Sequence, residues 1–264
     1  MTTGARRLTR CVWPRAVRRV RHSLCVVLVL LVPVAAAAET ITSARYTEPT
    51  TRYAHGVLGD AVEHGALEIE TKNNSGDALS SDTKDRNTRY VLRLPVERVF
   101  EDTQPRLADV DGDGKPEVIV VESHQNFGAR LAVYTYKRLL AATPYIGTRN
   151  RWLAPIGIAD MDGDGRIELA YIDRPHLAKT LRVWRFANGD LTEVATLGNL
   201  TNHRIGERDI AGGLRDCGSG TEMIVARADW QRLMAVTFDG KSLKARDIGG
   251  HTNRDSFAAA LGCK

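Results

Sequence analysis

One acidic, glycine-containing segment of nine residues occurs twice in this chain. Residues 109–117 read DVDGDGKPE, and residues 160–168 read DMDGDGRIE. Each copy places four carboxylates close together, where their mutual repulsion opposes folding unless a cation lies among them. Both copies stand between apolar, β-rich segments. The chain is therefore expected to fold as a repeat architecture whose loops bind a metal ion.

Residues 1–38 have the pattern of an export signal. Seven arginines and no acidic residue lie in this segment, together with an apolar run from Leu24 to Val34. Four alanines follow, ending at Ala38. A basic leader, a short apolar core and small residues before the cut are typical of a secretory signal peptide. We expect cleavage between Ala38 and Glu39.

The domain that would remain after cleavage comprises residues 39–264 and has no expected membrane span. An uncleaved membrane anchor is the alternative, although the apolar run is short for a bilayer and contains Pro33. The pair Arg18 and Arg19 leaves twin-arginine export open beside the general secretory route. Either route predicts a periplasmic or secreted protein.

The basic character of the whole chain comes from the leader. The chain has 37 basic and 32 acidic residues and a pI of about 9.1. Subtracting the seven leader arginines from the 37 leaves 30 basic against 32 acidic residues, a formal net charge of −2 for residues 39–264. This balance gives no support for nucleic-acid binding, and we expect no such partner.

Short β-rich segments surround each acidic loop. Residues 118–121 form an apolar run and residues 131–136 alternate, while residues 169–172, 181–186 and 191–195 repeat this pattern after the second loop. Each unit is therefore read as a strand, the acidic loop and three further strands. Four antiparallel strands in about 50 residues are the unit of a β-propeller blade. The predicted fold class is all-β.

Two weaker copies extend this register. Residues 60–68 and 214–222 keep an aspartate and the final glutamate but lack the central acids, and residues 254–263 resemble residues 208–217. We predict a small β-propeller of four or five blades made of four-stranded antiparallel sheets. In this prediction residues 254–263 form a closing strand that pairs with residues 39–53. An open arc of repeats is the alternative.

The cysteines are consistent with export. Cys11 and Cys25 lie in the leader, so Cys217 and Cys263 are the pair left in residues 39–264. Two cysteines in an oxidising compartment most simply form one disulfide, and two free thiols are the alternative. The disulfide would join the last full blade to the predicted closing strand.

A polar stretch interrupts the repeats at residues 71–88, where almost no apolar residue occurs. We expect a surface loop there. It is either a tolerated insertion or a loop that binds a partner.

The two intact loops offer oxygen ligands at alternate positions. We expect side-chain oxygens from loop positions 1, 3 and 5, a main-chain carbonyl from position 7 and a carboxylate from position 9. The loops are similar to the first half of an EF-hand loop, but they lie in a β context. Mg²⁺ prefers fewer carboxylates, so two Ca²⁺ sites are predicted, with a metal-free Asp/Gly turn as the alternative. The predicted ligands are Asp109, Asp111, Asp113, Lys115 (carbonyl) and Glu117 in the first loop, and Asp160, Asp162, Asp164, Arg166 (carbonyl) and Glu168 in the second.

The segments around these loops resemble a known repeat family. Residues 106–121, RLADVDGDGKPEVIVV, and residues 157–170, GIADMDGDGRIELA, look like FG-GAP/VCBS-type repeats. Such repeats form the calcium-binding blades of integrin α-subunit propellers and of many secreted bacterial proteins. The resemblance implies a propeller with calcium in its hairpin loops, at the ten positions given above. The Phe-Gly/Gly-Ala-Pro signature is absent apart from an isolated Phe127-Gly128, so the number of blades and the partner do not carry over.

The sequence does not identify an enzyme. No nucleophile elbow, phosphate-binding glycine loop or zinc motif appears. His124 and His176 occupy equivalent turns near Glu122 and Asp173, so a composite catalytic site there is one alternative to ordinary surface roles.

Three functions are consistent with these patterns. The favoured one is an exported, calcium-stabilised binding or scaffold module that contacts another envelope or extracellular protein. The second is a carbohydrate-binding or polysaccharide-active propeller, for which Trp152, Trp184 and Trp230 would supply stacking surfaces in place of the core packing expected of strand residues. The third is a purely structural envelope protein.

Overall fold

The computed structural model describes Met1 and residues 39–73, 87–250 and 253–264. The chain divides into two units, Met1–Ala36 and Ala37–Lys264, and every described strand and helix belongs to the second unit. The predicted signal peptide lies outside the described residues. So does most of the polar stretch predicted as a surface loop.

The described residues form an all-β structure, as the sequence predicts, with one short helix that the sequence does not predict. None of the described helices has the length and apolar character needed to cross a membrane. The elements are β1 (Glu39–Thr50), β2 (Glu63–Asn73), β3 (Asn87–Arg93), β4 (Arg98–Phe100), β5 (Arg106–Ala108), β6 (Glu117–His124), β7 (Gly128–Tyr134), β8 (Leu139–Ala142), β9 (Leu153–Ala159), β10 (Glu168–Asp173), β11 (Thr180–Ala187), β12 (Asp190–Leu197), β13 (Leu200–Thr201), β14 (Gly213–Asp216), β15 (Thr221–Arg227), β16 (Arg232–Phe238), β17 (Leu243–Gly250) and α1 (Arg254–Leu261).

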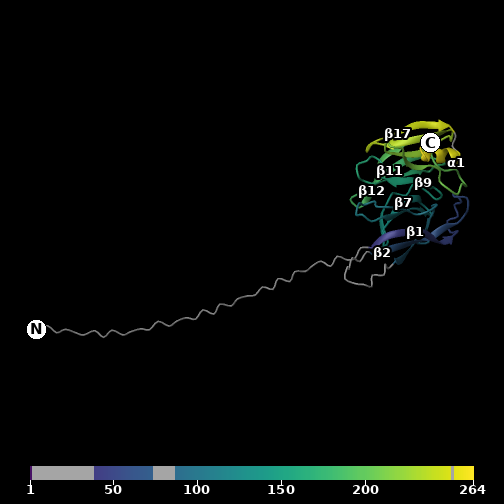
Figure 1. Ribbon diagram of the computed structural model, residues 1–264. Coiled ribbons are helices and arrows are strands. Elements are labelled where there is room, and N and C mark those ends of the chain that lie inside the picture. The colour runs from purple at the N-terminus through teal and green to yellow at the C-terminus, as the bar shows by residue number, and fades with distance from the viewer. Residues whose placement is uncertain (2–38, 74–86, 251–252) are drawn as a thin grey trace. The chain divides into compact units, whose positions relative to one another are not determined.

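The strands pair as successive antiparallel meanders. Strands β9 to β12 form an uninterrupted four-stranded sheet in the order β12-β11-β10-β9. The sheets before and after it have the same plan, but their opening strand is interrupted: β4 and β5 both pair with β6, and β13 and β14 both pair with β15. At the N-terminal end β2 pairs with β1, β3 and β4. Figure 1 shows the sheets following one another in chain order, from β1 and β2 to β17 and α1.

The middle strands β6, β10 and β15 are apolar on both sides because each faces two different cores. In β6, Ile119 and Val121 pack into the core shared with the β9–β12 sheet. Val118 and Val120 point the other way, into the core shared with β2. Alternate residues of a strand point to opposite faces, so one continuous apolar run serves both cores. The sheets therefore pack face to face through shared apolar layers.

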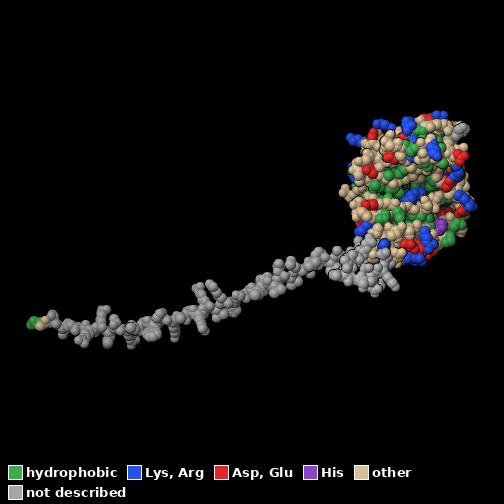
Figure 2. All heavy atoms as spheres, in the orientation of Figure 1, with side chains coloured by type: hydrophobic (Ala, Val, Ile, Leu, Met, Phe, Trp, Pro, Cys, Tyr) green, Lys and Arg blue, Asp and Glu red, His purple; other side chains and the backbone are tan. Residues whose placement is uncertain are grey.

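The same alternation recurs in the next two sheets. In β10, Leu169 and Tyr171 belong to the core shared with β6, and Ala170 and Ile172 to the core shared with β15. Figure 2 shows the result on one face of the molecule, where hydrophobic side chains are visible between charged side chains of both signs.

The acidic loops lie at equivalent places in this plan. Each joins the opening strand of a sheet to its middle strand, and the pairs Ala108–Glu117 and Ala159–Glu168 close the two intact loops. The decayed loops join β1 to β2 and β14 to β15. The two intact loops, the β14–β15 loop and the longer β1–β2 connection therefore all lie at the same end of their sheets.

The predicted closing strand is wrong. Residues 254–261 form helix α1, and β1 pairs with β2 instead of with the C-terminal segment. The helix begins with a capping box in which Asn253 and Ser256 exchange hydrogen bonds, and three alanines that favour helix follow. Phe257 and Ala260 of α1 are buried against the last sheet.

The predicted disulfide is present, but it holds the helix in place of a closing strand. Cys217 in the β14–β15 loop is bonded to Cys263, just after α1. A guanidinium nitrogen of Arg215 also donates a 2.7 Å hydrogen bond to the carbonyl of Ala260. The C-terminal helix is thus attached to the last sheet by a covalent bond, a hydrogen bond and apolar packing.

We expect the Cys217→Ser/Cys263→Ser double variant to lower the free energy of unfolding by about 2–4 kcal/mol, because the unfolded chain is no longer constrained across this loop. Denaturant unfolding of the wild-type and double-variant proteins would measure the difference. The wild-type protein unfolded with and without a reductant is the control. Equal midpoints in all samples would contradict a stabilising role for the bond.

Candidate metal centre

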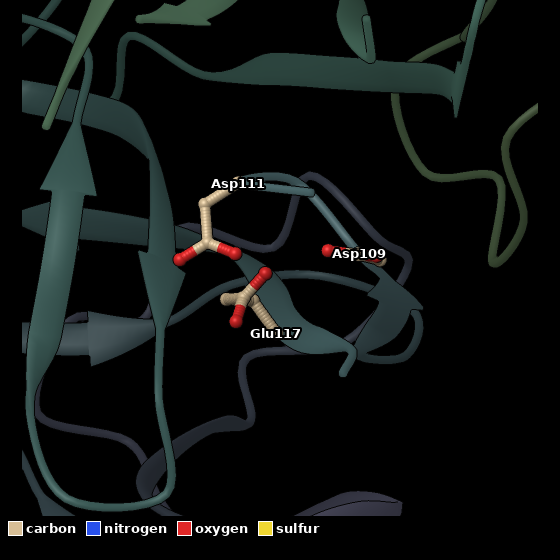
Figure 3. Close-up of side chains that lie close together, drawn as sticks. All are labelled: Asp109, Asp111 and Glu117. Atoms are coloured by element: carbon tan, nitrogen blue, oxygen red, sulfur yellow. The ribbon is translucent and has the colours of Figure 1, made fainter. Parts of the chain in front are cut away.

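Three carboxylates converge in the first acidic loop. Oxygen atoms of Asp109, Asp111 and Glu117 all lie within 4.8 Å of one another. Figure 3 shows these side chains turned toward a common space, with Glu117 at the start of β6 and both aspartates in the loop above it. Glu117 is buried, whereas Asp111 is exposed.

Main-chain hydrogen bonds hold this arrangement. The Asp109 carboxylate accepts from the N–H groups of Gly112 at 2.8 Å and Gly114 at 2.9 Å, and Glu117 accepts from Val110 at 2.9 Å. Gly112 and Gly114 have φ angles of 77° and 84°. Residues with a Cβ atom adopt such positive φ angles only at a cost in conformational energy. The glycines thus allow the chain to wrap around the carboxylates, as the sequence predicts.

The second loop repeats this geometry. Asp160, Asp162 and Glu168 form the same three-carboxylate group within 4.8 Å. Asp160 accepts from Gly163 at 2.7 Å and from Gly165 at 2.9 Å. Both predicted loops therefore bring their first, third and ninth positions together.

The fifth-position acids lie outside these groups. Asp113 accepts a 2.8 Å hydrogen bond from the main-chain N–H of Lys115, whose Nζ lies 3.7 Å from the same carboxylate. Asp164 accepts from the main-chain N–H of Arg166 at 2.9 Å and from its Nε at 3.0 Å. Ligation by these two acids, and by the carbonyls of Lys115 and Arg166, stays a prediction.

The electrostatics of the first loop favour a bound cation. Burial, followed by the charges of Asp111, Asp113 and Asp109, raises the pKa of Glu117 to about 7. A carboxylate whose proton is held this strongly has too little positive charge near it. The donors are all carboxylate oxygens, which suits a hard divalent ion better than a metal that prefers imidazole or thiolate.

An arginine enters the second loop. Arg185, on β11 opposite Glu168, places its Nε 2.5 Å from Glu168 and its Nη2 2.7 Å from Asp162. Burial raises the pKa of Glu168, while the hydrogen bond and charge of Arg185 act in the opposite direction. The two loops share a backbone but differ in the charge among their carboxylates.

In the decayed copy at residues 214–222, the charge of the final glutamate is balanced by arginines of the protein. Glu222, near the start of β15, accepts from Arg215 at 2.6 Å and from Arg246 at 2.7 Å. Burial opposes its ionisation, but the hydrogen bonds from Arg215 and Arg246 prevail and lower its pKa. Two guanidinium groups take the place that an ion would have.

The decayed copy at residues 60–68 has a different glutamate at the position equivalent to Glu117. The sequence register assigns Glu68, but that residue lies within β2 and pairs with Arg45. Glu63 closes the loop instead, and its carboxylate accepts main-chain hydrogen bonds from Ala54 at 3.1 Å and His55 at 2.9 Å. The β1–β2 connection is longer than the others, so the spacing read from the sequence misplaces the acid by five residues.

A cavity of about 470 Å³ lies beside the first loop. Asp109, Asp111 and Gly112 line one part of it, and residues 165–167 and 186–188 line another. The carboxylates of the first loop are therefore reachable by solutes.

The predicted composite site of His124 and His176 is not supported by their surroundings. The His124 ring packs against Phe127, at 4.6 Å between ring centroids, whereas Nε2 of His176 lies 3.0 Å from Nδ1 of His203. The nearby acids are committed to arginines: Glu122 to Arg98 and Arg130, and Asp173 to Arg174 and Arg182. Neither Glu122 nor Asp173 is therefore placed to activate His124 or His176.

Sequence reasoning missed a second polar cluster. Nδ1 of His55 lies 2.6 Å from a carboxylate oxygen of Glu101, and Ser123 donates to the other oxygen. The indole of Trp152 donates to the carbonyl of Glu101 at 2.8 Å. The pair His176 and His203 adjoins this cluster. Burial, and then the charge of His203, lowers the pKa of His176 to about 4. No spacing in the sequence links these six residues, because they come from six separate segments.

The tryptophans offer little open surface for stacking. Trp152 and Trp184 are buried, as core residues would be. Trp230 lies in the β15–β16 turn and not on a strand, and the guanidinium of Arg204 covers its ring at 3.7 Å. A carbohydrate platform made of these three residues is therefore not supported.

Comparison with known proteins supports the repeat assignment. Residues 109–171 match the family model of the FG-GAP-like repeat, which confirms the resemblance seen in the sequence. This segment begins at the first acidic loop and ends in β10. No curated protein has a significant match to the chain. Among solved structures, the crystal structure of the exotype rhamnogalacturonan lyase YesX is similar over 80% of this chain, with a TM-score of 0.42 and 17% sequence identity. The matched region covers 43% of that lyase chain.

The contrast between Glu117 and Glu222 gives a matched pair of variants. In a chelating buffer at pH 8, Glu117→Gln should raise the melting temperature, because the fold raises the pKa of this acid and so disfavours its charge. Glu222→Gln should lower the melting temperature, because its charge is paired. Each kcal/mol corresponds to about 2–4 °C in a domain of this size.

The pH dependence of the first variant follows from the same shift. The gain from Glu117→Gln should be full above the folded pKa of about 7 and vanish below the ordinary value of 4.5, where Glu117 is protonated in both states. Melting curves across this range would measure it. If Glu117→Gln instead destabilises the domain at pH 8, the charge of Glu117 is already balanced by a cation that the chelator does not remove.

Proposed function

We propose that residues 39–264 form a calcium-binding β-propeller of an exported protein, which acts as a binding or scaffold module for another protein. The observation that carries this proposal is the convergence of three carboxylates in each intact hairpin loop, with Glu117 buried among acids. Calcium in the loops would be structural, because it would hold the hairpin that joins the opening and middle strands of a blade.

Calcium is the favoured ion on the chemistry of the donors. The loops present carboxylate and main-chain oxygens on a flexible, glycine-containing turn, which suits the variable coordination of Ca²⁺ better than the strict octahedron of Mg²⁺. Sites in extracellular modules bind calcium in the range of about 10⁻⁴–10⁻³ M. Occupancy would then follow the calcium level outside the cell.

A propeller of four or five blades is supported by the stacked sheets and by one contact between distant repeats. The main-chain N–H of Gly206, between β13 and β14, donates a 3.0 Å hydrogen bond to the carbonyl of Val57 in the β1–β2 loop. The connections of the first and last sheets therefore meet. Blades arranged around an axis bring such connections together.

Export to a periplasmic or extracellular location is supported by the disulfide and by the leader pattern. A disulfide persists where the surroundings are oxidising, and Cys217 and Cys263 are bonded in the fold. The charge pattern of residues 1–38 is that of a signal peptide.

Protein binding is supported by exposed apolar side chains at the strand ends away from the acidic loops. Phe127 in the β6–β7 turn and Leu177 in the β10–β11 turn have exposed fractions of 51% and 60%, and Ile205 after β13 has 73%. The histidine pair His176 and His203 joins the second and third of these segments. We call Phe127, Leu177 and Ile205 the apolar turn surface. Exposed apolar groups on loops of a rigid scaffold are suited to contact a partner.

We expect calcium to raise the melting temperature of the chelator-treated domain. An ion present at about ten times its Kd adds about 1.4 kcal/mol to the free energy of unfolding. The Asp111→Asn/Asp162→Asn double variant should lose this response, because each loop loses a charged ligand. Asp190→Asn, which changes an acid at the start of β12, is the matched control and should keep this response. Identical melting in calcium and in chelator would refute the calcium function.

We expect the apolar turn surface to determine which proteins the domain captures from an extract of its own cell envelope. The Phe127→Ser/Leu177→Ser variant should lose captured proteins that the wild type retains. Leu107→Ser, which changes a 40% exposed residue beside the acidic loop, should retain them. Mass spectrometry of the eluates would make the comparison. If the wild type and both variants retain the same proteins equally, this surface is not the binding surface. Binding of the domain to a glycan array would instead favour the carbohydrate alternative.

A further inference from the structure

Arg185 occupies the centre of the second acidic loop. Its side chain is 10% exposed, and its guanidinium reaches three carboxylates: Glu168 at 2.5 Å, Asp162 at 2.7 Å and Asp164 at 3.3 Å. Two of these belong to the three-carboxylate group of that loop. The positive charge therefore lies where the sequence predicts a calcium ion.

The first loop has no arginine at the equivalent place. Arg185 is the cross-strand partner of Glu168. In the preceding sheet Val118 pairs with Tyr134, so the position opposite Glu117 falls on Thr135. Thr135 is uncharged, and its hydroxyl is engaged in the β7–β8 turn, where it donates to the carbonyl of Arg138 at 3.2 Å. One residue thus distinguishes two loops whose acids are otherwise alike.

The next sheet also encloses the second loop. The ring of Phe238 lies 5.8 Å from the guanidinium carbon of Arg185, and a Cβ added to Gly240 would lie 2.9 Å from Asp162. The side chain of Asp162 is only 6% exposed. In the first loop, Asp111 is exposed and lines the cavity. The second loop is closed over its arginine, whereas the first is open to an incoming ion.

We propose that Arg185 is the resident cation of the second acidic loop and makes the two loops unequal, so that the first binds calcium and the second binds it only when Arg185 is removed or displaced. This inference rests on the proposed calcium function. It changes the expected number of ions from two to one.

The inequality follows from charge and geometry. A calcium ion entering the second loop would meet a guanidinium that already uses the oxygens it needs, and the two cations repel at such short range. The guanidinium would have to leave a buried position where it makes three ion pairs. A planar, forked guanidinium satisfies several carboxylates at once, which a lysine cannot do. The second loop is thus stable without a metal.

Calorimetric titration of the chelator-treated mature domain with CaCl₂ tests this inference. The wild type should bind one ion. Arg185→Thr, which copies the residue of the first loop, should bind two, with at least a tenfold gain in affinity at the second loop. Thr135→Arg places a guanidinium opposite Glu117 and should weaken the first site at least tenfold, whereas Thr135→Ala, its control, should not.

Two loop variants give the same information without removing Arg185. In the wild-type background, Asp111→Asn should abolish the measured binding, and Asp162→Asn should leave one ion bound with unchanged affinity. This pair decides the question even if Arg185→Thr fails to fold.

The outcomes separate the inference from the function on which it rests. Two ions bound with similar affinity by the wild type, or binding lost equally in Asp111→Asn and Asp162→Asn, would overturn the role of Arg185 and leave the calcium function intact. No calcium bound by the wild type, by Arg185→Thr or by either loop variant would overturn the calcium function itself.

Discussion

A buried glutamate at the start of each middle strand is the constraint on which the hairpin loops depend. The four residues are Glu63, Glu117, Glu168 and Glu222, and each is at most 8% exposed. A buried carboxylate requires hydrogen bonds or an opposite charge. The repeats meet this requirement in different ways. Glu63 accepts hydrogen bonds from main-chain N–H groups, Glu168 pairs with one arginine and Glu222 pairs with two. Glu117 lies in a group of carboxylates that is suited to an ion. The same scaffold thus contains loops whose carboxylates could hold a metal ion and loops whose glutamate is paired with arginine.

Most local features of the fold, and the disulfide, could be predicted from the sequence, whereas the structure of the C-terminal segment could not. The runs at residues 118–121 and 169–172 indicate strands because their apolar side chains alternate between two cores, and the two intact acidic loops are placed correctly because their glycines fix the turn. The segment 254–263 is wrongly predicted as a strand because its similarity to residues 208–217 is stronger than any helix signal. Its capping box and alanines became decisive only where the last sheet offered an apolar face to Phe257.

The candidate site shows the same limit. The spacing of the acids predicted the convergence of Asp109, Asp111 and Glu117, because all three lie in one hairpin, but it also assigned Asp113, which lies outside this group. Arg185 comes from a strand 17 residues after Glu168, and the enclosing Gly240 comes from another sheet. No local pattern links these residues to the loop. The charge that surrounds an acidic loop therefore depends on neighbours that the motif does not contain.

Because β6, β10 and β15 each contribute to two cores, we do not expect the sheets to behave as independent modules. If one sheet opens, it uncovers the apolar faces of both of its neighbours, so the cost of opening extends along the stack. Unfolding is then cooperative across residues 39–264. The domain also has little tolerance for the loss of a whole repeat, since a shortened stack would leave one apolar layer in water.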